Sequence, residues 1–264
     1  MMMKKEEPGR IGSMVLLKVL WRSFFFQAAN NYERMQNVGF AYCIAPALER
    51  LYEGEELRLA TQRHLAFFNS HPYMTAALLG AVIKMEEEIA QGRLDPQHVT
   101  RFKAAMMGPM AAIGDSFFWA SLRPMAAALA IFGVLAGQIW APILFVILFN
   151  LFHLGVRWHG IFGGYAAGQG ICQSIHRLSL VGFAQKSHYM TAVVLGCIGA
   201  LFVDHAHLSE RSLGNGMEPF LIGILTVIFV LALKRDIKMP FILYGFTLGC
   251  IALIASFNTL LPLK

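Results

Sequence analysis

Charged residues are scarce in this sequence: they make up 14% of its 264 residues, whereas an average soluble domain contains about a quarter. Hydrophobic residues account for 56%, and 21 residues are phenylalanine. This apolar surplus is larger than the single core of a soluble domain of this length buries. We therefore predict an integral membrane protein, in which lipid covers the apolar surface.

Cysteine is also sparse. The four cysteines are far apart in the sequence: Cys43, Cys172, Cys197 and Cys250. Metal sites usually show a close pair of Cys or His ligands, and the trio of Asp204, His205 and His207 is isolated. We expect buried free thiols and no metal site.

Signatures of nucleotide and hydrolase chemistry are missing. The sequence has no GxxxxGK[ST] and no GxSxG, and the glycines of 160–170 indicate close helix packing or a loop. The net charge of +6 comes from short basic clusters beside apolar runs, which is typical of cytoplasmic loops. We expect no catalytic residue, no cofactor and no nucleic-acid partner.

The C-terminal half contains the longest apolar runs. Residues 239–262 have no charge over 24 positions and form the strongest predicted span, since about 20 apolar residues cross a bilayer as a helix. Residues 219–233 and 187–203 are shorter candidate spans. If Lys234, Arg235 and Lys238, which lie between 219–233 and 239–262, face the cytoplasm, residues 204–218 lie on the outer side of the membrane.

A further uncharged run of 33 residues lies between Arg123 and Arg157. As one helix it would be about 50 Å long, which exceeds the bilayer. Glycines and a proline interrupt it. We predict two pieces, 124–136 and 142–155, joined by a bend or re-entrant turn.

The apolar segments of the first half are only 10 or 11 residues long: 39–48, 73–83 and 104–114. They suit core helices, interfacial segments or re-entrant hairpins. Before them, residues 13–26 form a predicted amphipathic helix at the cytoplasmic membrane surface, with Lys18 and Arg22 on one face.

Together these patterns predict an all-α integral membrane protein. Its fold would be a multi-helix bundle, with short broken or re-entrant helices in the first half and about three full spans in the C-terminal half. Residues 1–12 are the predicted cytoplasmic tail, and residues 13–264 are one predicted membrane domain. This domain has three regions: 13–26 (interfacial helix), 27–123 (polar motifs and short helices) and 124–264 (transmembrane helices).

Residues 27–37 (QAANNYERMQN) are unusually polar for this chain. On a helix, one arc of about 120° would contain five polar side chains: Gln27, Asn30, Glu33, Arg34 and Asn37. In an apolar protein such a face must meet water, a sugar or a partner. The alternative is that Glu33 and Arg34 pair with neighbouring helices while the amides cap backbone groups.

Two later clusters contain isolated polar residues. His71 precedes Pro72, which favours a helix start near Pro72, and a lone histidine is most often structural. Asp115 either caps a following helix or forms an intramembrane ion pair with Arg123 or Arg34. The run Glu86, Glu87 and Glu88 is most simply a solvated face.

Four segments occur in an order and spacing that resemble the IID component of the mannose/fructose/sorbose phosphotransferase family: NYERMQNVGF (31–40), NSHPYMTAALLGAVIKMEEE (69–88), KAAMMGPMAAIGDSFFWASLRP (103–124) and FNLFHLGVRWHGIFGGYAAG (149–168). Ser70 stands where the family commonly has Thr, and Ser116 replaces a frequent Pro or Ala. Both replacements are small and polar, so the resemblance holds.

The resemblance implies a bacterial inner-membrane, multi-pass subunit of a sugar permease. IIC and IID would form the membrane part, as a trimer of heterodimers, while the cytoplasmic IIA and IIB subunits carry phosphohistidines and IIB phosphorylates the sugar during import. It implies no phosphorylation site on this chain, and places much of the sugar contact on IIC.

The predicted substrate-pathway or IIC-interface residues are Gln27, Asn30, Asn31, Glu33, Arg34, Gln36, Asn37, His71, Asp115, Trp119 and Arg123. The leading hypothesis is a non-catalytic subunit that translocates a hexose-type sugar together with IIC. The alternative is a scaffold for IIC folding and assembly, and a third hypothesis is a membrane-embedded enzyme centred on His71 and Asp115.

Overall fold

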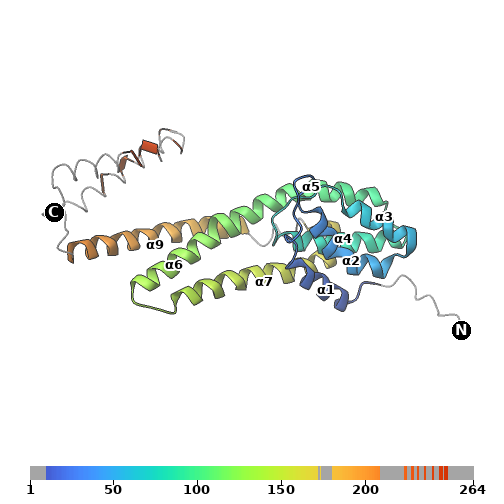
Figure 1. Cartoon of the computed structure of the whole chain (residues 1–264), viewed down its shortest axis with the longest axis horizontal. Helices are drawn as coiled ribbons and strands as arrows, with labels where there is room; N and C mark the ends of the chain where they lie inside the picture. The colour runs from blue at the N-terminus through green and yellow to red at the C-terminus, as the bar shows by residue number, and fades with distance from the viewer. Residues whose placement is uncertain are drawn as a thin grey trace. The chain divides into compact units, whose positions relative to one another are not determined.

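The computed structural model describes residues 10–171, 173 and 180–208, and isolated positions between 223 and 248. In these residues every regular element is helical, as predicted, and the only extended pairing consists of two isolated bridges at Met35. The chain divides into two compact units, Met1–Ile198 and Gly199–Lys264. Most described residues belong to the first unit, which is shown with its helix labels in Figure 1.

The helices follow one another in this order: α1 (Ser13–Ser23), α2 (Asn37–Leu51), α3 (Gly54–His64), α4 (Thr75–Ala90), α5 (Pro96–Gly114), the π-helix η1 (Asp115–Leu122), α6 (Arg123–Leu135), α7 (Ala141–Ala167), the 3₁₀ turn η2 (Gly168–Gly170) and α9 (Leu180–Leu208). In the first unit, α2 packs against α1, α3 and α4, and α4 packs against α7. Figure 1 shows α1 to α4 gathered at one end of the hairpin that α6 and α7 form.

Helix α4 is the centre of this packing. Every residue from Thr75 to Ile83 is buried, which is expected of a helix that is apolar on all sides. The short run 73–83 therefore lies mainly in a core helix, one of the alternatives that its length allowed. The helix begins at Thr75, three residues after Pro72.

Glycines let α4 and α7 approach each other at backbone distance. A Cβ atom on Gly80 would lie 2.2 Å from the carbonyl oxygen of Ile161, and one on Gly164 would lie 2.3 Å from that of Ala77. Real Cβ atoms do not come so close to a backbone atom, so only glycine fits at these two positions. The predicted close packing of the 160–170 glycines is thus confirmed for Gly164.

Helices α5, η1 and α6 form one continuous rod from Pro96 to Leu135. Asp95 caps its start, because its carboxylate accepts a hydrogen bond from the Gln97 amide at 2.7 Å. A turn at 136–140 then reverses the chain into α7, with Gly137 at φ +81°. The predicted bend between 124–136 and 142–155 is confirmed.

Two helices of the described residues are long and apolar enough to cross a membrane: Pro96–Leu135 and Ala141–Gly170, each of which contains an 18-residue stretch with a mean hydropathy of 1.6. The candidate span 187–203 lies within α9. Apart from isolated positions, the candidate spans 219–233 and 239–262 fall outside the described residues, as does most of the loop 204–218.

The helix expected over 27–37 is not present. Residues 24–36 form successive turns, and α2 begins only at Asn37. Asn31 Oδ1 accepts a hydrogen bond from the Arg34 amide at 2.8 Å, and Met35 has a left-handed φ of +56°. Asparagine side chains compete for backbone donors in this way and favour turns over helices, so the predicted polar arc was wrong.

The cysteines are free thiols where the structure describes them: Cys43 is buried and Cys197 is exposed. The expectation of burial is thus correct for Cys43 and wrong for Cys197. Cys172 and Cys250 lie outside the described residues.

Candidate functional site

The polar turn at 27–37 fastens the loop between α3 and α4. Asn37 donates from Nδ2 to the Leu65 carbonyl at 2.8 Å, and Gln36 Oε1 accepts from the Ser70 amide at 2.8 Å. Asn31 in turn donates to Asn37 Oδ1 at 2.8 Å. These three amides therefore hold two loops together. Two of them bind backbone groups of the loop between α3 and α4, which is the alternative that the sequence analysis gave for the amides of this stretch.

Other predicted residues of this turn face outward. Gln27, Asn30, Glu33 and Arg34 are exposed, and Arg34 forms an ion pair with Glu33 at 3.5 Å. Their exposure makes them available to a partner or to solvent.

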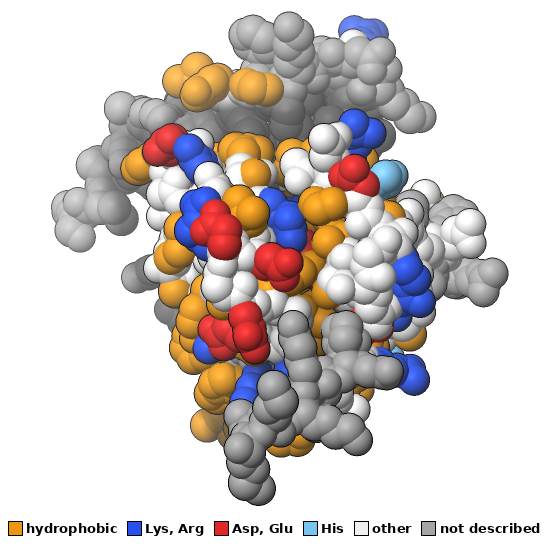
Figure 2. All heavy atoms as spheres, turned by 90° about the vertical axis from the view of Figure 1, so that its right-hand side faces the viewer, with side chains coloured by type: hydrophobic (Ala, Val, Ile, Leu, Met, Phe, Trp, Pro, Cys, Tyr) orange, Lys and Arg blue, Asp and Glu red, His pale blue; other side chains and the backbone are white. Residues whose placement is uncertain are grey.

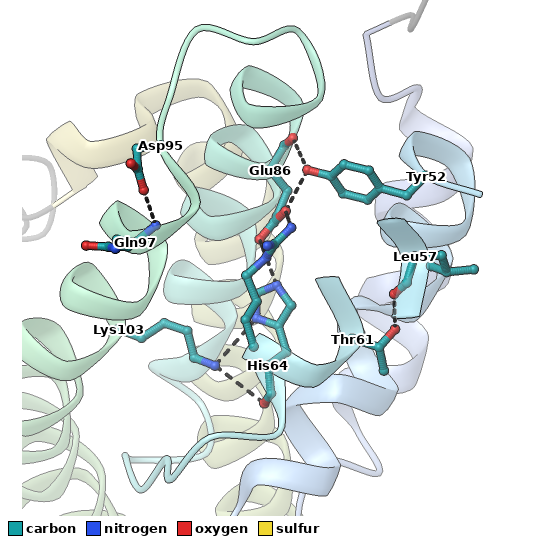
Figure 3. A network of polar contacts seen from close by, with 9 residues as sticks. Tyr52, Leu57, Thr61, His64, Glu86, Asp95, Gln97 and Lys103 are labelled. Atoms are coloured by element: carbon teal, nitrogen blue, oxygen red, sulfur yellow. Dashed lines mark hydrogen bonds and ion pairs between the residues drawn. The ribbon is translucent and has the colours of Figure 1, made fainter. Parts of the chain in front are cut away.

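A second group of polar side chains, the Glu86 cluster, lies between the end of α2 and helices α3, α4 and α5, and all of its members are buried except Arg63, which is partly exposed. It consists of Tyr52, Arg63, His64, Glu86 and Lys103 (Figure 3). Arg63 binds both carboxylate oxygens of Glu86, at 2.9 and 3.0 Å, as guanidinium and carboxylate groups pair in their strongest geometry. His64 Nε2 lies 3.0 Å from Glu86 Oε1, and the Tyr52 hydroxyl donates to Oε2 at 2.8 Å.

Lys103 completes the Glu86 cluster from α5. Its Nζ atom lies 3.4 Å from His64 Nδ1 and 4.3 Å from the centre of the Phe40 ring. Because an ammonium group only donates, Nδ1 accepts and Nε2 carries the proton that binds Glu86. Burial lowers the pKa of His64 to about 4, while His64 and Arg63 lower that of Glu86 against the opposing effect of its burial.

Glu87, the next residue, is also buried and paired. It binds Lys84 Nζ at 2.7 Å and accepts from the Ile11 amide at 3.0 Å and from the Tyr165 hydroxyl. The prediction of a solvated face was therefore wrong for Glu86 and Glu87, whose partners come from distant parts of the chain. Figure 2 shows where charges do reach the surface: red and blue side chains intermingle on the face presented by the end of the unit that holds α1 to α4.

A third group, the Arg157 cluster, lies where α7 passes the turn before α4. It consists of Ser23, His71, Tyr73, His153 and Arg157. Arg157 donates from Nε to His153 Nε2 at 2.7 Å and from Nη1 to the hydroxyl and carbonyl oxygens of Ser23. Its guanidinium lies 5.2 Å from the centre of the Tyr73 ring.

Arg157 is 4% exposed and forms no ion pair with a carboxylate among the described residues. Neutral acceptors and aromatic faces take the place of a counter-ion, which leaves a buried positive charge without a neutralising partner. A charge of this kind in an apolar helix is typical of functional positions.

His71 contributes an unsatisfied donor to the same cluster. Its Nδ1 atom accepts from the Tyr73 amide at 3.3 Å, so the proton is on Nε2, and this buried atom has no hydrogen-bond partner among the described residues. Burial, reinforced by nearby Arg157, lowers the pKa of His71 to about 4, which keeps the ring neutral. An unpaired buried N–H costs free energy and calls for an explanation.

The π-helix η1 brings aromatic residues to His71. The His71 ring stacks on Phe118 at 5.2 Å between centroids, and Trp119 lies 4.9 Å away and is half exposed. Gly114, four residues before Phe118, leaves the space that His71 fills, since a Cβ there would lie 2.2 Å from the His71 ring. Of the predicted residues, the structure thus brings His71 and Trp119 together.

Asp115 and Arg123 do not join this cluster. Both are exposed, and no ion pair links Asp115 with Arg123 or Arg34 in the described part of the chain. Asp115 lies inside the continuous helix Pro96–Leu135, so it does not cap a helix start either. Both interpretations of Asp115 were wrong, because the helix continues through the Gly-Asp-Ser sequence.

Sequence reasoning overlooked the polar face of α7. Asn150, His153 and Arg157 are spaced three and four residues apart, so they share one helix face, and His153 Nδ1 lies 3.5 Å from Asn150 Oδ1. This spacing within an otherwise apolar run could have indicated a polar helix face. Among the described residues no group of three or more His, Cys, Asp or Glu side chains is arranged to hold a metal ion.

Known proteins resemble this chain over most of its length. The family model of the "PTS system mannose/fructose/sorbose family IID component" matches residues 10–257. The "PTS system mannose-specific EIID component" of Escherichia coli (strain K12) is 37% identical over 195 residues, which cover 72% of this chain and 68% of that protein. The "Fructose permease IID component" of Bacillus subtilis (strain 168) is 34% identical, with 74% and 71% covered.

Solved structures agree with these relatives. A chain described as "Structure of membrane protein" has a TM-score of 0.71 and 29% identity, with 94% of this chain and 98% of that one covered. A chain of the mannose transporter ManYZ in complex with microcin E492 has a TM-score of 0.59 and 30% identity, with 94% and 97% covered. The chain is therefore an all-α membrane protein and belongs to the IID component family of the mannose/fructose/sorbose phosphotransferase system.

Proposed function

We propose that this chain works with a IIC subunit to translocate a hexose-type sugar across the bacterial inner membrane, while IIB phosphorylates the sugar during import. Its family, and the similarity to a chain of a mannose transporter, support this role. In this proposal the phosphoryl chemistry belongs to IIB, and the present chain is a non-catalytic, multi-pass subunit.

The Arg157 cluster carries the proposal. It combines a buried guanidinium that has no carboxylate partner in the described residues with an unpaired His71 N–H, and Trp119 extends its aromatic wall toward the surface. Sugars are bound by hydrogen bonds to their hydroxyls and by contact of their C–H faces with aromatic rings. A sugar hydroxyl or an acceptor of IIC would satisfy the donors that this chain leaves unused.

Arg157→Gln tests the proposal in cells that express the complete permease. We expect the variant to co-purify with IIC as the wild type does, and phosphoenolpyruvate-dependent uptake to fall at least about tenfold. Arg101→Gln is the matched control, because Arg101 is exposed and bonds only to Gln97, one turn away, among the described contacts. Its uptake should be unchanged.

His71→Gln separates transport from folding in the same assay, since an amide can replace the ring N–H without leaving a buried charge. If both variants lost co-purification with IIC to the same extent as they lost uptake, the result would favour a scaffold over a translocating subunit. Undiminished uptake by IIC and IIB in the absence of this chain would refute the proposal.

A further inference from the structure

Helix α1 exposes large apolar side chains although its other face is packed. Leu16, Val19 and Ser23 are buried against the rest of the unit, whereas Met14 and Trp21 are 70% and 66% exposed. Phe24 and Phe25 follow directly and are also exposed, and both contact Trp21 edge-on or tilted. Surface aromatic clusters of this size mark contact with a partner or with lipid.

Two adjoining hollows lie along this exposed face, and both are lined by Lys18 and Arg22. One, of about 410 Å³, is otherwise lined by Met14, Leu17 and Trp21. The other, of about 270 Å³, is completed by side chains of α1 and α2: Val15, Pro46, Glu49 and Arg50. A basic pair thus separates an apolar hollow from a polar one.

The polar hollow is predominantly basic, with three cations against Glu49. Arg22 is held in place, since Nη1 donates to the Tyr42 carbonyl at 3.1 Å and the guanidinium lies 4.8 Å from the centre of the Tyr42 ring. Lys18 is exposed beside it. Guanidinium and ammonium groups arranged in this way suit the oxygens of a phosphate group.

We infer that this surface binds an anionic phospholipid, with its phosphate between Lys18, Arg22 and Arg50 and the start of an acyl chain along Met14, Leu17 and Trp21. The order of chemistries along α1 matches an amphiphile: cations beside an apolar hollow, with tryptophan at the boundary where tryptophans of membrane proteins gather. Free phosphate would use only the basic half, and an acidic peptide would leave the apolar half unfilled.

Lipid titration of the purified full-length chain, together with its co-purifying partners in detergent, tests this inference. Bound phosphatidylglycerol and phosphatidylcholine are counted by native mass spectrometry. Lys18→Gln should weaken phosphatidylglycerol binding about fivefold, and the double variant with Arg22→Gln about 25-fold, since each cation near an anionic lipid contributes equally. Phosphatidylcholine binding should not change.

Two further variants make the outcome decisive. Trp21→Ala should weaken the binding of both lipids, because it removes the apolar contact, and Arg101→Gln should affect neither. Equal effects of Lys18→Gln on the two lipids, or displacement of phosphatidylglycerol by an equal concentration of inorganic phosphate, would overturn the inference. So would loss of a co-purifying subunit in Lys18→Gln with unchanged lipid selectivity, which would assign this face to a protein partner.

Discussion

The Glu86 cluster and the Arg157 cluster both bury charged side chains near α4, one close to its end and the other just before its start, but they satisfy these charges differently. Glu86 meets a bidentate Arg63, a tyrosine and a histidine. Arg157 meets only neutral acceptors and aromatic faces among the described residues, beside the unpaired His71 N–H.

This difference separates a structural network from a candidate binding site. A fully paired buried network fixes the helices that contribute to it and has no capacity for a ligand. A cluster with an unneutralised charge and an unused donor has that capacity, at the expense of stability. We therefore expect substitutions at Glu86 to affect folding and substitutions in the Arg157 cluster to affect transport.

The largest effect is expected at the contact between α4 and α7, because α4 carries Glu86 and α7 carries Arg157. Gly164→Ala places a Cβ 2.3 Å from the Ala77 carbonyl oxygen, so the helices must separate. The free energy of unfolding should fall by at least about 4 kcal/mol, or the variant should not fold. Gly163→Ala, where a Cβ meets open space, is the control. Yield of monodisperse protein in detergent measures the difference, and equal yields would contradict the packing.

Glu86→Gln should be the next most damaging change. It leaves Arg63 and Lys103 without the carboxylate that compensates them, and breaking a buried ion pair costs about 3 kcal/mol or more. Glu88→Gln is the control in the same run of acids, because Glu88 is only partly buried and forms none of the ion pairs described. Thermal unfolding in detergent distinguishes the two, and similar shifts would show that the network is not stabilising.

Acid should weaken the Glu86 cluster through His64, and the lowered pKa of His71 gives the Arg157 cluster a pH dependence of the same sign. Folding lowers the pKa of His64 to about 4, whereas the unfolded chain binds this proton below about pH 6.5. Stability should therefore fall as the pH drops from about 6.5 toward 4, by up to about 1.4 kcal/mol per pH unit for this one proton, and the lowered pKa of Glu86 acts in the same direction below about pH 4.5.

Unfolding temperatures at a series of pH values measure this slope. His64→Gln should reduce the slope between pH 6.5 and 5, because the variant has no group at that position that takes up a proton, whereas the contribution of His71 remains. An unchanged slope in the variant would assign the pH dependence to other groups.

The smallest effect is expected for Asp115→Asn. This carboxylate is exposed and has no ion-pair partner in the described part of the chain, so the free energy of unfolding should change by less than about 0.5 kcal/mol. Unfolding and uptake are measured on the same variant. A large loss of stability would reveal a contact that the structure does not show, whereas reduced uptake at normal stability would place Asp115 in the pathway or in the interface with IIC.

Much of the helical layout was predictable because it follows from local composition. A helix within 13–26, the break near Gly137 and the separate apolar pieces on either side of it all appear in the structure. Close packing at Gly164 was predictable, since clustered small residues favour close helix packing, but its partner helix was not. Within the candidate site, His71 and Trp119 were identified from the motifs that contain them.

The remaining parts were not predictable from local patterns. The polar arc at 27–37 assumed helical geometry, but the asparagines there form turns, and Asn37 binds a loop 28 residues further on. Glu86 and Glu87 were assigned to a solvated face because their partners, Arg63 and Tyr165 among them, are distant in sequence.

The sequence by itself determined that this chain is a helical membrane protein of the IID family, because apolar composition and motif order are properties of the chain alone. Only the tertiary structure decided which charges are buried and which of them are paired. Burial and pairing depend on which helices meet, and for α4 and α7 the meeting is a backbone-distance contact at which Gly80 and Gly164 leave no room for a side chain.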